Sequence, residues 1–396
     1  MRKKLLWASD STYLPTGYAN QTRYILNTLS QIYDGYLFSH QYPGQEEMRD
    51  NYVHIPGGHS AYGKDQIDYY IGKYKPDMTA WLCDAFMINW LHENGSLGGA
   101  GKRKSWQEKY PNMKTLFYFP FDSEDVYPGA KEVMETFDYR VAMSRFGQKL
   151  LKKETGLDSW YIPHCTDTGI FYPLSQQEKD NIKKNSGLEG KYVVGMVGRN
   201  QSRKNPQRLL YAFAEFAKDK PEAVLLLHCD PLDPQAAGSM PWIAQKLGIA
   251  EKVLFTGVTW YSGIPQANLA QVYNAMDVHT MSTTGEGFGI TTIEAMACGI
   301  PNVITDYTST QELLVEDGKC GIPVPYSDFI NGGYATKRVL PDINKMVDAL
   351  QFCYDNRDEA RRMGEVGRAK VLRNYSLQNV MPQWVLLMKN ILQLGI

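Results

Sequence analysis

The sequence predicts an α/β protein with two domains, each built on a parallel sheet. Short apolar runs alternate along the chain with amphipathic stretches, which is the pattern of successive strand–helix units. This alternation starts near residue 4 and starts again at Tyr192. A length of 396 residues also fits two domains of about 150 residues or more.

The first half contains four expected strands and two expected helices. The first helix carries Tyr24, Ile25, Leu29 and Ile32 on one face, and the second begins after Ser144, a favourable N-cap residue. The expected strands are 4–8, 78–82, 115–119 and 139–143, and the expected helices are 19–33 and 145–154.

The second half repeats the pattern after the segment 160–173 and a polar stretch, 176–189, and we place the hinge in this region. The helix over 290–298 ends at Gly299 with Pro301 behind it, a favourable helix stop. The expected strands are 192–197, 223–228, 253–256, 278–281 and 302–305, and the other expected helices are 205–218, 267–275 and 376–394. The predicted domains are 1–166 and 167–375, followed by the amphipathic helical segment 376–396.

The composition excludes some classes of protein. Hydrophobic residues make up 43% and charged residues 21%, which excludes a disordered chain. The net charge of −1 argues against a protein that holds nucleic acid mainly by charge. The mean hydropathy is −0.40 and no apolar run approaches the roughly 20 residues of a membrane helix. Six cysteines without a C-x-x-C pair indicate reduced thiols. We expect a cytoplasmic protein, and attachment to a membrane surface stays open.

The stretch 285–301 carries the strongest chemical signal. Gly285, Gly287 and Gly289 form a loop that leaves a strand and enters a helix, where free backbone N–H groups favour an anion such as phosphate. Glu286 lies in the loop and Glu294 about one turn into the helix. The alternative is a plain turn with two solvated glutamates.

Two other loops follow expected strands. In 198–206 the cations Arg199 and Lys204 are placed to hold a diphosphate, although a solvated basic loop is equally compatible. In 9–22 Gly17 allows the backbone to approach a ligand closely, although one glycine in a turn often serves only the turn.

Together these residues resemble the retaining glycosyltransferases of family 4, most specifically over 192–325. Glu286 and Glu294 match the E-x7-E motif of that family, and Arg199 and Lys204 match its diphosphate-binding pair. Gly17 stands where the family has a glycine-rich loop. The resemblance implies the GT-B fold, in which two Rossmann-like domains face each other across a cleft and a C-terminal helix crosses back to the first domain.

The resemblance also implies roles for the motif residues. Glu286 would bind hydroxyls of a donor sugar and Glu294 the ribose of a nucleotide. Arg199 and Lys204 would neutralise the leaving diphosphate, so neither a metal nor another cofactor is expected. Donor contacts are expected from the loop residues Gly17, Gly287, Phe288, Gly289, Ile290 and Thr291. The implied reaction transfers a sugar from a nucleotide-diphosphate sugar with retention of anomeric configuration.

Asp122 follows the expected strand 115–119, where members of that family often have a histidine or an acidic residue. It is a candidate contact for a donor hydroxyl or an acceptor. A turn or helix cap is an equally good interpretation.

The segment 95–109 combines four glycines with a basic end. Lys102, Arg103 and Lys104, with Trp106, are candidates for a lid that contacts an anionic acceptor. The alternative is a solvated loop.

Other functions also remain open on the sequence. The chain could be a non-catalytic module that binds a nucleotide sugar or a glycan, or a sugar-nucleotide epimerase on the same fold. The acceptor could be a glycan, lipid, protein, small metabolite or modified nucleobase. Neither the donor base and sugar nor the oligomeric state can be predicted.

Overall fold

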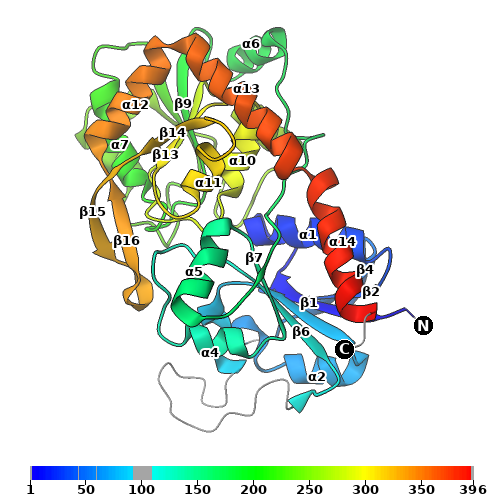
Figure 1. Ribbon diagram of the computed structural model, residues 1–396. Coiled ribbons are helices and arrows are strands. Elements are labelled where there is room, and N and C mark those ends of the chain that lie inside the picture. Colours follow the sequence, from blue (N-terminus) through cyan, green and yellow to red (C-terminus); the bar gives the residue numbers. More distant parts are fainter. Residues whose placement is uncertain (1, 43, 59, 92–108, 394–396) are drawn as a thin grey trace. The chain divides into compact units, whose positions relative to one another are not determined.

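The computed structural model describes residues 2–42, 44–58, 60–91 and 109–393 (Figure 1). The chain forms two compact units. Unit 1 comprises Met1–His164, Tyr334–Thr336 and Leu377–Ile396, and unit 2 comprises Cys165–Gly333 and Lys337–Ser376. These boundaries lie one or two residues from the expected divisions after 166 and 375, and the segment 334–336 is an addition to the first unit.

Unit 1 is built on an eight-stranded sheet in the order β3-β4-β2-β1-β5-β6-β7-β8. Every neighbouring pair is parallel except β3 and β4, which are antiparallel at one edge. The strands are β1 Lys4–Asp10, β2 Asp34–His40, β3 Glu47–Arg49, β4 Tyr52–Pro56, β5 Met78–Leu82, β6 Lys114–Phe119, β7 Tyr139–Ala142 and β8 Trp160–Tyr161.

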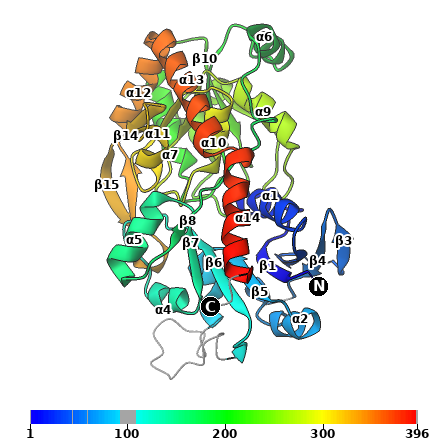
Figure 2. The same ribbon diagram turned by 45° about the vertical axis from the view of Figure 1, so that its right-hand side comes forward.

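The C-terminal helix belongs to unit 1, in agreement with the predicted fold class. It lies beside α1 in both views (Figures 1 and 2). Its Trp384 is fully buried and meets the rings of Trp7 and Tyr118 edge-on, at 5.6 and 4.8 Å between centroids. The helices of this unit are α1 Gly17–Leu29, α2 Ile67–Tyr74, α4 Ala130–Glu135, α5 Arg145–Thr155 and α14 Leu377–Gln393, with 3-10 turns η1 Ala61–Gly63 and η2 Ala85–Leu91.

Unit 2 contains a six-stranded, fully parallel sheet in the order β11-β10-β9-β12-β13-β14. Its central strands are buried along their whole length, as expected where helices cover both faces. The strands are β9 Tyr192–Val197, β10 Ala223–His228, β11 Val253–Phe255, β12 Val278–Met281, β13 Asn302–Thr305 and β14 Gly321–Val324.

The polar stretch at the end of the expected hinge region is partly helical. Helix α6 begins at Ser175, whose side chain and that of Glu178 form a reciprocal capping box. This capping box stabilises the helix, although the helix has few apolar residues. The helices of unit 2 are α6 Gln176–Asn185, α7 Pro206–Phe216, α8 Met240–Lys246, α9 Gln266–Asn274, α10 Ile290–Ala297, α11 Thr310–Leu314, α12 Ile343–Asp355 and α13 Arg357–Asn374, with a 3-10 turn η3 Ala250–Lys252.

An antiparallel hairpin of β15 Tyr326–Asn331 and β16 Lys337–Pro341 follows β14 and was not predicted. All six residues of β15 are exposed, so the strand lacks the alternation of buried and exposed residues that sequence patterns detect.

Two composition-based expectations can be compared with the structure. All six cysteines lie in the described part of the chain, where each is buried and free of a disulfide. Among the described residues, no helix is both long enough and apolar enough to cross a bilayer.

Candidate functional site

The candidate site of unit 2 lies where the strand order reverses. From β9 the chain proceeds to β10 on one side, and it returns to place β12 on the other side of β9. The loops 198–205 and 282–289 therefore leave the carboxyl ends of two adjacent strands. Ligands of open α/β sheets bind at such a switch point.

Hydrogen bonds join these two loops directly. The Thr284 amide donates to the Arg203 carbonyl at 2.8 Å, and the Ser282 hydroxyl donates to the Asn205 carbonyl at 2.6 Å. The bonds hold the end of one loop against the start of the other. The side chains of both loops thus have a fixed relative position.

Glu286 and Lys204 form a nearly buried ion pair at this position. The Lys204 Nζ lies 2.6 Å from Glu286 Oε1, and the two side chains are 14% and 11% exposed. Burial raises the pKa of the Glu286 carboxyl, but the charges of Lys204 and Arg203 outweigh it and lower this pKa to about 2. Glu286 is therefore an ionised hydrogen-bond acceptor at neutral pH.

Arg203 is a site residue to which the sequence motifs assigned no role. Its Nη1 donates to the Gly285 carbonyl at 2.5 Å and lies 3.4 Å from Glu286 Oε2. The only available signal was its place beside Lys204 in a basic run, and spacing cannot tell which cation reaches the carboxylate.

The glycine-rich loop is also held from the opposite side. The Glu286 amide donates to the Thr308 hydroxyl at 3.1 Å, and the Ser309 hydroxyl donates to the Phe288 carbonyl at 2.7 Å. The Phe288 ring is buried against Tyr375, so its expected donor contact would have to come from its backbone. Gly287, Ile290 and Thr291 are the partly exposed positions of the stretch 285–291.

Gly289 is the N-cap of α10 and has a φ of +108°. Glycine has no side chain with which to cap this helix end, so the first backbone N–H groups of α10 can face an anion. A Cβ at position 289 would lie 2.9 Å from Cδ1 of the buried Leu313. The positive φ favours glycine, and an added Cβ would also require the Leu313 side chain to shift.

We expect Gly289→Ala to lower the free energy of unfolding by roughly 1–3 kcal/mol. Urea denaturation measures this change. Gly187→Ala is the matched control, because Gly187 has a φ of +70° but open space around the added carbon. The control should cost less, and an equal cost would mean that the contact with Leu313 contributes nothing.

Glu294 occupies a different environment from Glu286. It is buried in α10, where Tyr273 of α9 donates a hydrogen bond to its Oε2 at 2.8 Å. Burial raises the pKa of Glu294 to about 7, against a smaller lowering by the Tyr273 hydrogen bond. Tyr273 could not be found from the sequence, because it resembles any other apolar residue of its helix.

The raised pKa of Glu294 predicts a pH dependence of stability. The folded state holds this proton up to a pKa of about 7, whereas the unfolded chain loses it near 4.5. The stabilisation is complete below pH 4.5 and is lost as the pH rises through 7, by on the order of 3 kcal/mol. Chemical denaturation between pH 5 and 8 should show this fall, flattened in Glu294→Gln. Identical pH profiles would contradict it.

Arg199, in the loop after β9, forms an ion pair with Asp233. Its Nε and Nη2 contact the two carboxylate oxygens of Asp233 at 2.6 and 3.3 Å. Asp233 follows β10, the neighbour of β9, and its side chain is fully buried. No sequence motif indicated this partner.

The comparison with protein families assigns most of unit 2. The family model described as "Glycosyl transferases group 1" matches residues 178–370. This range includes Arg199, Lys204, Glu286 and Glu294. Residues 178–370 are a group 1 glycosyltransferase domain. The resemblance that the sequence motifs indicated is thereby confirmed.

Known proteins extend the comparison beyond the group 1 domain. The mannosylfructose-phosphate synthase of Agrobacterium fabrum is 28% identical over 232 residues, which cover 57% of this chain and 50% of that protein. The chain thus spans about half the length of this curated relative.

Solved structures share the fold of the whole chain. The sucrose-phosphate synthase of Thermosynechococcus elongatus matches with a TM-score of 0.78 and 19% identity, over 100% of both chains. Anabaena HepE in complex with UDP and glucose matches with a TM-score of 0.71 and 14% identity, over 98% of this chain and 100% of that one. The two parallel-sheet units, with the group 1 domain in the second, have the GT-B fold that was predicted.

Two predicted site residues lie in unit 1, outside the group 1 domain. Gly17 is the first residue of α1, directly after the N-cap Thr16, whose hydroxyl donates to Asp10 at 2.7 Å. Asp122 is partly buried in the turn that follows β6. Lys102, Arg103, Lys104 and Trp106, the predicted lid residues, lie outside the residues that the structure describes.

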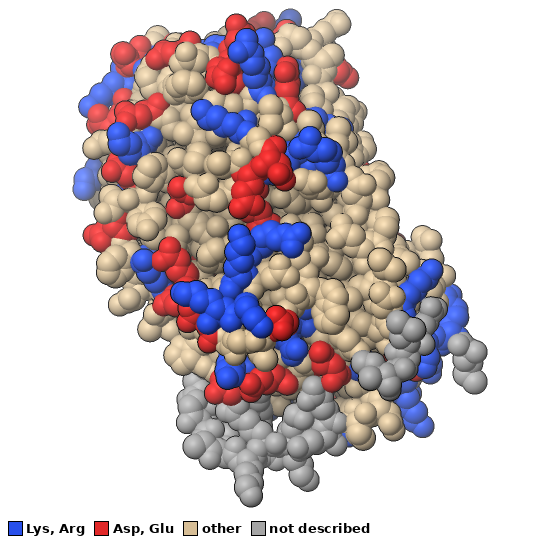
Figure 3. Space-filling view, in the orientation of Figure 1, with Lys and Arg blue, Asp and Glu red and all other residues tan. Residues whose placement is uncertain are grey.

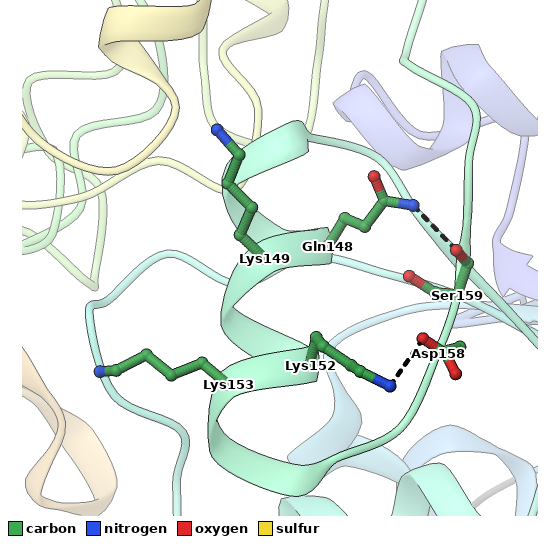
Figure 4. Close-up of a pocket in the computed structure, with 6 residues that line it drawn as sticks. All are labelled: Gln148, Lys149, Lys152, Lys153, Asp158 and Ser159. Atoms are coloured by element: carbon green, nitrogen blue, oxygen red, sulfur yellow. Dashed lines mark hydrogen bonds and ion pairs between the residues drawn. The ribbon is translucent and has the colours of Figure 1, made fainter.

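A shallow hollow of about 410 Å³ lies against α5 of unit 1 (Figure 4). It is lined by Gln148, Lys149, Lys152, Lys153, Asp158 and Ser159, and no predicted site residue lines it. Lysines gather over this helix, with acidic side chains beside them (Figure 3). Lys152 points to Asp158 at 2.9 Å, and Lys153 pairs with Glu154 at 2.7 Å. These lysines also stabilise the helix C-terminus, so the hollow needs no ligand to explain it.

In the described part of the chain, no group of three or more His, Cys, Asp or Glu side chains could hold a metal ion. His228 ends β10 and its Nδ1 lies 2.9 Å from the Thr256 hydroxyl. Burial lowers the pKa of His228 to about 4, so its ring is neutral at neutral pH.

Proposed function

We propose that this protein transfers a sugar from a nucleotide-diphosphate sugar to an acceptor hydroxyl, with retention of anomeric configuration and without a metal. One observation carries the proposal: Lys204 and Arg203 converge on the ionised Glu286 beside the uncapped N-terminus of α10. Such a site offers cations and backbone N–H groups to a diphosphate and a carboxylate to sugar hydroxyls.

The cations would perform the work that a metal performs in other phosphate-transferring sites. Lys204 donates a hydrogen bond to Glu286 and would bring its positive charge next to the diphosphate oxygens. Arg199, after the same strand, would add a third cation. Preorganised charges of this kind stabilise the negative charge that develops on a leaving diphosphate.

The assignment of the donor class draws on a protein of the same fold. HepE was solved in complex with UDP and glucose, which are the two parts of a nucleotide sugar. By analogy, Glu294 would accept hydrogen bonds from the ribose and Glu286 from the transferred sugar. The partly exposed Gly287, Ile290 and Thr291 would supply backbone donors to the phosphates.

The proposed reaction exchanges one bond at the anomeric carbon for another. The bond from this carbon to the diphosphate oxygen breaks, and a bond to the acceptor oxygen forms on the same face of the sugar. The acceptor proton passes to an oxygen of the departing diphosphate. Because the pKa of Glu286 is about 2, its carboxylate stays ionised and stabilises positive charge on the sugar rather than donating a proton.

We propose a hydroxyl of a small phosphorylated sugar as the first acceptor to test. Two similar proteins are named mannosylfructose-phosphate synthase and sucrose-phosphate synthase, and both names denote a phosphorylated disaccharide. Glycans, lipids and modified nucleobases belong in the same panel, because the acceptor side lies in the part of the chain with the weaker motif signal.

A donor screen tests the proposal directly. UDP, GDP and ADP sugars are each incubated with the purified chain in EDTA, and the release of nucleoside diphosphate is measured with and without acceptors. We expect release from one donor class, stimulated by an acceptor, and an NMR spectrum of the product with the anomeric configuration of the donor. Binding of a nucleotide sugar without any release would instead support a non-catalytic module, and interconversion of the sugar without transfer would support an epimerase.

A further inference from the structure

We propose that Asp233 is a positioning residue that holds Arg199 in the orientation needed to bind the donor diphosphate. The inference rests on the proposed function and extends it to a residue outside the matched motifs. It concerns the loop 229–235 after β10, which no feature of the sequence had marked.

The geometry of the pair is that of an orienting contact. Asp233 engages Nε and Nη2 of Arg199, which form one edge of the planar guanidinium. The opposite edge, at Nη1, is therefore directed away from Asp233. The arginine side chain remains 34% exposed although the carboxylate that holds it is fully buried.

The carboxylate itself is fixed by its own loop. Asp233 Oδ1 accepts a hydrogen bond from the Gln235 amide at 2.8 Å, and the Asp233 amide donates to the Asp230 carbonyl at 3.4 Å. Because the position of this carboxylate is fixed, its two contacts hold the arginine in one orientation.

A second loop restricts the face of the guanidinium. The Arg199 guanidinium carbon lies 5.0 Å from the centre of the Trp260 ring, within the range of a cation–π contact. The Trp260 amide in turn donates to Asp230 Oδ2 at 3.0 Å. Residues after β9, β10 and β11, three adjacent strands, thus converge on one cation.

This arrangement has a physical consequence for diphosphate binding. A free arginine side chain loses rotamer entropy when a ligand immobilises it. Asp233 and Trp260 have already restricted that freedom before the ligand arrives. Preorganisation of a charged donor improves both binding and the stabilisation of charge on the leaving group.

The test is a double-mutant cycle read by calorimetry. UDP, GDP and ADP, and the matching nucleosides, are titrated into wild type, Asp233→Asn, Arg199→Ala and the double variant. We expect Asp233→Asn to weaken binding of the preferred diphosphate about tenfold and to leave nucleoside binding unchanged. In the Arg199→Ala background the same substitution should change affinity less than about twofold, because its effect passes through the arginine.

Asp219→Asn is the control, since Asp219 is an exposed carboxylate that pairs with Lys220. Arg199→Lys tests the same idea without a change at the buried position. It keeps the positive charge but not the planar fork, and we expect it to weaken diphosphate binding nearly as much as Arg199→Ala. Asp233→Glu should restore part of the affinity lost in Asp233→Asn.

The outcomes separate this inference from the function on which it rests. If wild type binds none of the three diphosphates, the proposed function is wrong and the inference with it. If wild type binds and Arg199→Ala weakens binding, but Asp233→Asn does not, only the positioning role is overturned. Full diphosphate affinity in Arg199→Lys, or equal effects of Asp233→Asn in both backgrounds, would overturn it as well.

Discussion

Glu286→Gln should reduce sugar transfer by a factor on the order of 100–1,000 while the chain stays folded. Glutamine keeps the shape of the side chain but removes the negative charge that would face the sugar in the transition state. It also turns an amide nitrogen toward Lys204 or Arg203, which contact the carboxylate oxygens of Glu286 in the wild-type protein. Steady-state kinetics with the donor identified by the screen measure the loss, and circular dichroism monitors the fold.

The acid dependence of stability provides an independent readout of the same substitution. The pKa of Glu286 is about 2 in the folded chain and 4.5 as its ordinary value. The stabilisation from its ionised form is therefore present above pH 4.5 and is lost as the pH falls toward 2. Glu286→Gln should lack this loss.

Glu294→Ala is the matched comparison for the kinetic effect. If Glu294 binds the ribose, the variant should raise the KM for the donor and bind the nucleotide more weakly, with a smaller change in kcat. Mild and equal effects of Glu286→Gln and Glu294→Ala would contradict the two assigned roles.

Lys204→Ala should weaken binding of the nucleoside diphosphate about tenfold or more and leave binding of the nucleoside unchanged. A charge-assisted contact that is shielded from water contributes roughly 1.5–3 kcal/mol, and Lys204 is nearly buried. The variant also removes the closest partner of Glu286, so the pKa of that carboxyl should rise toward its ordinary value. Calorimetric titration with both ligands measures the two affinities.

Lys218→Ala is the control for a general effect of charge, because Lys218 is an exposed lysine that pairs with Glu215. The role of the cations also predicts full activity in a chelator. Activity that is lost in EDTA and restored by magnesium or manganese would contradict the proposal that Lys204 and its neighbours replace a metal.

The unit 2 sheet was largely predictable because its strands are short apolar runs bounded by polar loops. The expected strands 192–197, 223–228, 278–281 and 302–305 coincide with β9, β10, β12 and β13. Burial gives β9 and β10 nearly continuous apolar sequences, which are easily recognised.

Elements with weaker patterns were missed. β2 begins with Asp34 and Gly35 and carries partly exposed positions, so its apolar run is interrupted. Half of the residues of helix α13 are charged, and two of its buried positions are Gly364 and Gly367. A Cβ at Gly364 would lie 2.0 Å from the Gly299 carbonyl oxygen. This close approach of α13 to the end of α10 depends on small residues that a hydrophobic pattern does not detect.

The sequence by itself determined the strand–loop–helix order. It placed Arg199, Lys204 and Glu286 in loops that follow strands and Glu294 in the next helix, since these features depend on local spacing. Only the tertiary structure decided which charges pair. Lys204 and Glu286 are 82 residues apart, and Arg199 and Asp233 are 34 apart. They meet because β9 lies between β10 and β12 in the sheet. Both glutamates are buried, but the charges of Lys204 and Arg203 lower the pKa of Glu286, whereas burial raises the pKa of Glu294.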